Sequence, residues 1–147
     1  MRSWRQTIEK RSRVASRVLD AWAALAWLSG EGEAAIQVRR LLLAARRGKF
    51  QLIMSIINLG EVYYRTAKVS DEANARLILD RFRHTPVVVV PVENQLVFQA
   101  ASLKARFPIS YADSFAAALA VQRGARLVTG DLDFRPLEVA KLLTIHW

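Results

Sequence analysis

The sequence contains no cysteine and only two histidines, His84 and His146, among its 147 residues. Without cysteine the chain can form neither a disulfide framework nor a thiolate metal site or nucleophile. Two histidines are too few for most histidine-rich zinc sites. A bound metal would therefore be held mainly by oxygen atoms, the ligands that Mg²⁺ and Mn²⁺ prefer.

Long apolar segments and acidic residues are also scarce. No apolar run approaches the roughly twenty residues needed to cross a bilayer, which excludes an integral membrane protein. Asp and Glu number 13 against 22 Lys and Arg, so the formal net charge is +9. This balance predicts an acidic partner, with nucleic acid or an acidic protein segment as the first candidates. A hydrophobic share of 52% predicts a packed globular core rather than disorder.

Much of the positive charge lies at the N-terminal end, where residues 1–17 hold six basic residues and one acidic residue. This segment lacks the apolar core of a secretory signal, so we expect the protein in the cytoplasm. We expect residues 1–17 to form a disordered basic extension and residues 18–147 to form one folded domain. Two interpretations of the extension remain open: an arm that binds phosphates, or an overhang produced by an upstream start codon.

Short apolar segments alternate with helical patterns along the rest of the chain. Four β-branched residues at 87–90 form the clearest strand pattern, one that suits a strand covered on both faces. Other strands are expected at 18–19, 51–54, 126–129 and, at an edge, 142–145. Helices are expected from 21 to Gly30 and at 33–47, 55–67, 71–83, 94–106 and 111–123. The alternation predicts a three-layer α/β/α fold around a central, mainly parallel sheet.

Five acidic side chains fall where such a fold builds ligand sites, beyond the carboxyl ends of its strands. Asp20 ends the first strand, and Asp131 and Asp133 follow the strand at 126–129. Glu61 lies on the helix after strand 51–54, and Asp113 lies in the first turn of another helix. Clustered carboxylates raise one another's pKa unless a cation lies among them, so the pattern implies a divalent ion, Mg²⁺ or Mn²⁺.

Each acid also has a purely structural explanation. Ser110 and Asp113 fit a capping box, and Asp131 and Asp133 are common turn residues. Asp20 is the hardest to explain in this way, because an acid in a buried apolar stretch is costly without a partner. The aromatic and apolar residues at helical spacing are predicted to belong to the core rather than to stack on bases: Trp22, Trp27, Phe115 and Leu119.

Four segments, in order, resemble PIN-domain nucleases and, more narrowly, the VapC-type toxins of bacterial toxin–antitoxin pairs. The segments are VLDAWAALAWL at 18–28, SIINLGE at 55–61, ISYADSFAAALA at 109–120 and LVTGDLDF at 127–134. The resemblance covers about residues 18–147. It implies an RNA-cleaving α/β/α domain that uses Mg²⁺ or Mn²⁺, forms a homodimer and is inhibited by a cognate antitoxin.

The same resemblance implies the roles of individual residues. The family's catalytic and metal-binding acids correspond here to Asp20, Glu61, Asp113 and Asp131, with Asp133 and Thr129 as accessory residues. Ala21 departs from the family pattern, because Ser or Thr usually follows the first acid. Two alternatives remain open. One is a non-catalytic PIN-fold module that binds RNA or protein, and the other is a phosphoryl-transfer domain, whose early acidic pair this sequence lacks.

Overall fold

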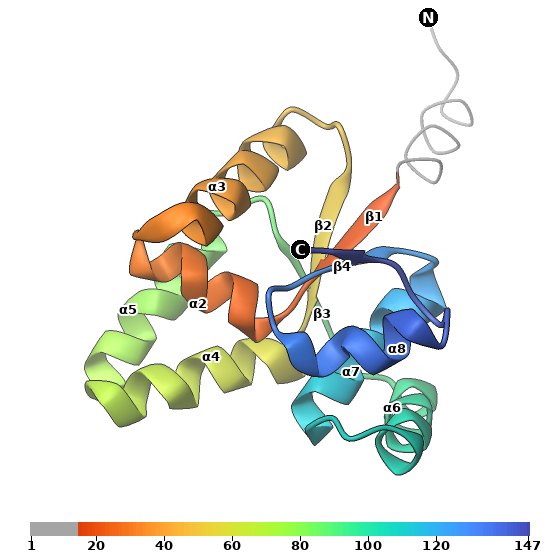
Figure 1. Ribbon diagram of the computed structural model, residues 1–147. Coiled ribbons are helices and arrows are strands. Elements are labelled where there is room, and N and C mark those ends of the chain that lie inside the picture. Colours follow the sequence, from red (N-terminus) through yellow and green to blue (C-terminus); the bar gives the residue numbers. More distant parts are fainter. Residues whose placement is uncertain (1–14) are drawn as a thin grey trace, which may run out of the picture.

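The computed structural model describes residues 15–147, in which strands and helices alternate (Figure 1). The strands are β1 (Ser16–Leu19), β2 (Gln51–Ser55), β3 (Val88–Val90), β4 (Arg126–Val128) and β5 (Ile145–His146). The helices are α2 (Ala21–Ser29), α3 (Gly32–Arg46), α4 (Ile56–Val69), α5 (Glu72–Arg83), α6 (Asn94–Arg106), α7 (Tyr111–Arg123), the 3₁₀ turn η1 (Leu132–Phe134) and α8 (Arg135–Val139). Most of the expected basic extension, residues 1–14, lies outside the described residues.

The strands form one sheet in the order β3-β2-β1-β4-β5, and every pairing is parallel. The central strand β1 has a neighbour on each side, with Val18 opposite both Ile53 of β2 and Leu127 of β4. From β1 the chain runs one way through β2 and β3 and then returns to the other side for β4 and β5. The predicted parallel α/β/α architecture is therefore confirmed.

Two hydrophobic cores cover the two faces of the sheet, as the two-residue period of a strand requires. Val18 and Leu127 point into one core, with residues of α6, α7 and α8. Leu19 and Val128 point into the other, with residues of α2, α3, α4 and α5. These two groups of helices lie on opposite sides of the sheet in Figure 1.

The ends of two strands differ from the sequence-based expectations. Strand β1 begins at Ser16, two residues earlier than expected, because Ser16 and Arg17 continue the parallel ladder with β2. Strand β3 packs Val89 and Val90 against opposite cores, which agrees with the prediction of a strand covered on both faces. It has only one neighbour, however, and Val88 at this sheet edge is 43% exposed.

The prediction that Trp22 belongs to the core was wrong. Its side chain is 39% exposed, whereas Phe115 and Leu119 are buried. Trp22 lies in the first turn of α2, and its ring meets Gly130 in the loop after β4 instead of joining either hydrophobic core. Within residues 15–147, none of the helices is both long and apolar enough to cross a membrane.

Candidate acidic site

The candidate site lies where the order of strands in the sheet reverses. Strands β1 and β4 are neighbours in the sheet, but the chain leaves them toward opposite sides. In parallel sheets this divergence opens a crevice beyond the carboxyl ends of the two strands. Asp20 directly follows β1, and Thr129 and Asp131 follow β4, so residues more than a hundred positions apart in sequence meet there.

Asp20 is held rigidly by two hydrogen bonds. It is the N-cap of α2, and its Oδ1 accepts from the backbone N–H of Ala23 at 2.8 Å. Its Oδ2 accepts from the hydroxyl of Thr129 at 2.5 Å. The side chain is only 1% exposed, and this burial raises the pKa of Asp20 from 3.8 to about 7. The two hydrogen bonds oppose the rise, and the nearby charges of Asp113 and Asp131 add to it.

The loop after β4 is organised around the Thr129 hydroxyl. That oxygen donates to Asp20 and accepts from the backbone N–H of Asp131 at 3.0 Å. Asp131 in turn caps η1, its Oδ1 accepting from the backbone N–H of Asp133 at 2.9 Å. A chain of hydrogen bonds thus joins the acid of β1 to the two acids that follow β4.

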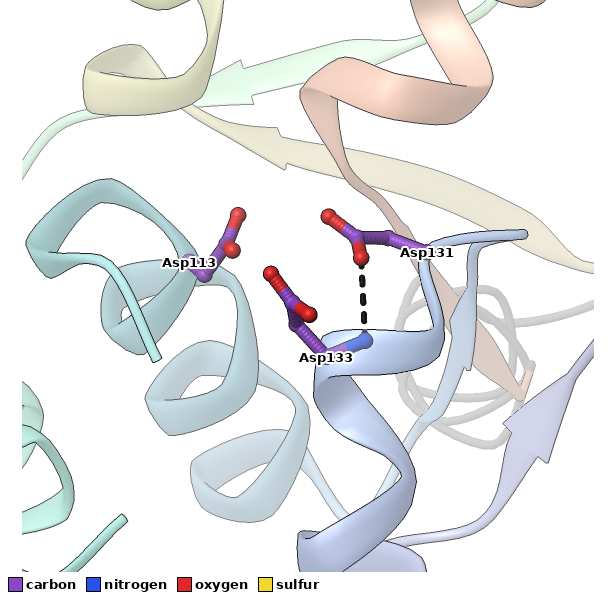
Figure 2. Close-up of side chains that lie close together, drawn as sticks. All are labelled: Asp113, Asp131 and Asp133. Atoms are coloured by element: carbon purple, nitrogen blue, oxygen red, sulfur yellow. Dashed lines mark hydrogen bonds between the residues drawn. The ribbon is translucent and has the colours of Figure 1, made fainter. Parts of the chain in front are cut away.

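Three carboxylates point toward one another beyond the ends of β1 and β4 (Figure 2). Asp113 comes from the first turn of α7, while Asp131 and Asp133 come from the segment after β4. One carboxylate oxygen from each lies within 4.8 Å of the other two. Like charges at this spacing repel one another unless a proton or a cation lies between them.

The electrostatics of Asp113 reflect this crowding. Ser110 caps α7 by accepting from the backbone N–H of Asp113 at 3.1 Å, as the capping-box pattern predicted. Burial, and then the charges of Asp131, Glu61 and Asp133, raise the pKa of Asp113 to about 6, although Ser110 opposes the rise. The capping role and the position in the acidic cluster are therefore compatible.

Glu61 reaches the site from α4 and is 6% exposed. Its Oε1 lies 3.5 Å from Nη2 of Arg65, and its Oε2 has no hydrogen-bond partner. Burial, and to a lesser extent the charge of Asp131, raises the pKa of Glu61, while the guanidinium of Arg65 and the nearby amide of Asn58 lower it. A buried carboxylate oxygen without a partner is costly and leaves room for a further ligand.

Asn58 is a site residue that the sequence reasoning missed. It is fully buried one helical turn before Glu61, and its Nδ2 donates to the backbone carbonyl of Ala112 at 3.0 Å. This bond ties α4 to α7 directly beside Asp113. The available signal was an amide residue placed among apolar positions of the SIINLGE segment.

The structure arranges the predicted residues in two groups. Asp113, Asp131 and the predicted accessory residue Asp133 form the tight cluster, and Asp20 and Glu61 lie outside it. The charge of Asp131 nevertheless raises the pKa of both Asp20 and Glu61. The side chains of the site offer a metal ion only oxygen ligands, from carboxylates, the Thr129 hydroxyl and the Asn58 amide. Two of these buried oxygens, Oδ1 of Asn58 and Oε2 of Glu61, have no hydrogen-bond partner. This donor set fits Mg²⁺ or Mn²⁺ and does not suit a soft metal ion.

Comparisons with known proteins identify the family and the fold of the chain. A family model described as PIN domain matches residues 17–139. The chain resembles the DNA-bound VapBC of Salmonella typhimurium, with a TM-score of 0.69 and 20% identity over 90% of this chain and 98% of that one. It resembles VapBC2 of Rickettsia felis, bound to a DNA fragment from the promoter, with a TM-score of 0.68 and 18% identity over 89% and 97%.

A third similar structure is Mycobacterium tuberculosis VapC20, described as a Sarcin-Ricin loop cleaving toxin. Its TM-score is 0.63 and its identity 21%, over 82% of this chain and 93% of that one. No curated protein sequence matches the chain. The fold and family expected from the four sequence segments are thereby confirmed.

Proposed function

The chain belongs to the PIN domain family, and on that premise we propose that it is a metal-dependent ribonuclease acting as the toxin of a toxin–antitoxin pair. The observation that carries the proposal is the gathering of Asp113, Asp131 and Asp133 beside the buried Asp20 at the reversal of strand order. RNA as the substrate class is supported by the description of VapC20 as a Sarcin-Ricin loop cleaving toxin. A formal net charge of +9 also favours a polyanionic substrate.

We assign the binding of Mg²⁺ or Mn²⁺ to Asp20, Glu61, Asp113 and Asp131, with Asp133 in an accessory role. A divalent ion bound there supplies positive charge that activates a water molecule and offsets the charge of the phosphate. The protein's own contribution is to hold the carboxylates in place before the substrate arrives. Hydrogen bonds from Thr129 and Ala23 achieve this for the Asp20 carboxylate, and the backbone N–H of Asp133 does so for Asp131. The Ser110 cap of α7 fixes the backbone of Asp113.

The proposal is tested by incubating the purified chain with single-stranded RNA in Mg²⁺ or Mn²⁺ and, separately, in chelator. Cleavage that needs the metal supports the nuclease. A DNA oligonucleotide of the same sequence tests the substrate class. RNA binding without cleavage under any of these conditions would favour the alternative, a non-catalytic PIN-fold binding module.

Replacing Asn58 with Ala is expected to slow cleavage about tenfold or more and to lower the free energy of unfolding by roughly 1–3 kcal/mol. The substitution leaves the part-buried carbonyl of Ala112 without its donor and removes the side-chain link between α4 and α7. Urea unfolding and single-turnover cleavage measure the two effects. Asn94→Ala, at an exposed position on α6, is the matched control and is expected to change neither. Full activity in Asn58→Ala would remove Asn58 from the site.

We also propose that the chain acts in the cytoplasm and binds a cognate antitoxin, since VapBC structures from two bacteria have the same fold.

We expect the chain to form a homodimer as well. Several large apolar side chains are exposed on the described surface, among them Ile56, Tyr64, Leu77 and Phe98. Light scattering at tens of micromolar, on protein shown by its absorbance ratio to be free of nucleic acid, measures the mass. A monomer under these conditions would contradict the dimer.

A further inference from the structure

Trp22 is an exposed indole placed next to the acidic site. It lies two residues after Asp20, in the first turn of α2, and 39% of it is accessible. A tryptophan side chain normally buries most of its large apolar surface. Trp27 on the same helix does so by packing edge to face on Phe82 and beneath the guanidinium of Arg81. Within residues 15–147, Trp22 has no aromatic or cationic partner of this kind.

The indole rests on the backbone of Gly130, between the accessory Thr129 and the acidic Asp131. A Cβ added to Gly130 would lie 2.2 Å from Cη2 of Trp22 and 2.5 and 2.6 Å from two further ring atoms. Gly130 is not among the described glycines with positive φ, so its backbone conformation does not require glycine. Glycine is required here by the close approach of the Trp22 ring, which occupies the space that a Cβ would fill. Residue 130 is therefore glycine to accommodate the indole, and the contact fixes the ring beside the loop that carries Asp131.

A fixed, half-exposed aromatic ring beside an RNA-cleaving site is suited to binding a base. Single-stranded RNA is recognised largely by stacking of its unpaired bases on aromatic side chains. The rigid backing of Gly130 lowers the entropy cost of such a contact, because the ring is already ordered. We propose that Trp22 is a stacking platform for a nucleobase of single-stranded RNA and positions the adjoining phosphate at the acidic cluster. This inference rests on the proposed nuclease function.

The test measures RNA affinity separately from cleavage. Binding of a labelled single-stranded RNA is measured in Mg²⁺ on an Asp20→Asn background, with and without Trp22→Ala or Trp22→Phe. Loss of one stacked base corresponds to about a 5- to 150-fold weaker affinity for Trp22→Ala. Trp22→Phe, which keeps an aromatic face, is expected to lose less. Trp27→Phe is the matched control and is expected to bind like the parent. Thermal unfolding of each variant verifies that it is folded.

Two further measurements separate stacking from a general packing effect. The methyl group of Gly130→Ala displaces the Trp22 ring, so this variant is expected to weaken RNA binding as Trp22→Ala does. In the double variant, Gly130→Ala is expected to cause no further loss of affinity beyond that of Trp22→Ala. An RNA that lacks one base at the stacked position is expected to bind the parent and the Trp22→Ala variant equally well.

The proposal is overturned if the folded Trp22→Ala variant binds RNA as tightly as the parent. It is equally overturned if Trp22→Ala changes the dimerisation of the protein but leaves its RNA affinity unchanged. If RNA binding depends on Trp22 but the wild-type chain never cleaves RNA, the platform stands and the nuclease function fails. If the wild-type chain cleaves RNA and Trp22→Ala does so with unchanged KM, the nuclease stands and the platform fails.

Discussion

Asp20→Asn is expected to reduce metal-dependent RNA cleavage at least about a hundredfold while the protein remains folded. The amide has the same shape as the carboxylate, so its oxygen can still accept from the N–H of Ala23 and its NH₂ can donate to the Thr129 hydroxyl. What the substitution removes is the negative charge that the metal needs. Asp113→Asn is expected to have the same effect for the same reason. Cleavage rates in Mg²⁺ and Mn²⁺, together with thermal unfolding, measure both parts of the prediction.

Asp71→Asn provides a closely matched control. Asp71 is also the N-cap of a helix, and its side chain accepts from the backbone N–H of Asn74 at 2.7 Å, but it is exposed and lies outside the site. Its replacement is expected to leave cleavage unchanged. Equal losses of cleavage rate in Asp20→Asn and Asp71→Asn would mean that the loss of a helix cap, and not the loss of metal binding, explains the result. Wild-type rates that persist in chelator would rule out the metal.

In chelator, the protein is expected to become less stable as the pH rises from about 4 to about 8. Burial raises the pKa of Asp20 from 3.8 to about 7 and that of Asp113 to about 6, so the folded state binds more protons than the unfolded chain in this range. A carboxyl with a raised pKa contributes its full stability below the unfolded value and loses it as the pH rises through the folded value. Between pH 5 and 8, Asp20 alone accounts for a loss of roughly 2–3 kcal/mol.

Urea unfolding at pH 5 and pH 8, with chelator or with excess Mg²⁺, measures this dependence. The metal is expected to stabilise the protein more at pH 8, where it binds the ionised carboxylates without displacing protons. Asp20→Asn is expected to reduce the pH dependence of stability in chelator, because it removes the contribution of Asp20 and leaves that of Asp113. Equal or greater stability of the wild-type chain at pH 8 than at pH 5 in chelator would contradict the prediction.

Much of the secondary structure and the candidate acids could be predicted because those features are local. Apolar periodicity placed the helices, and Ser55, Asp71 and Ser110 begin three of them by accepting from backbone N–H groups two or three residues onward. Asp20 and Asp131 were identifiable because each is an acid just after a short apolar run. The resemblance of four segments to PIN domains then implied that these acids share one site.

The sequence alone determined the alternation of strands and helices, the helix caps and the positions of the acids at the ends of strands. Only the tertiary structure decided that β1 lies between β2 and β4, since strand order depends on how whole layers pack. The same packing brought Asp133 into the closest carboxylate cluster, buried Asn58 between α4 and α7, and set Trp22 against Gly130. These contacts join residues distant in sequence, and periodicity along one segment carries no information about which distant segment it will meet.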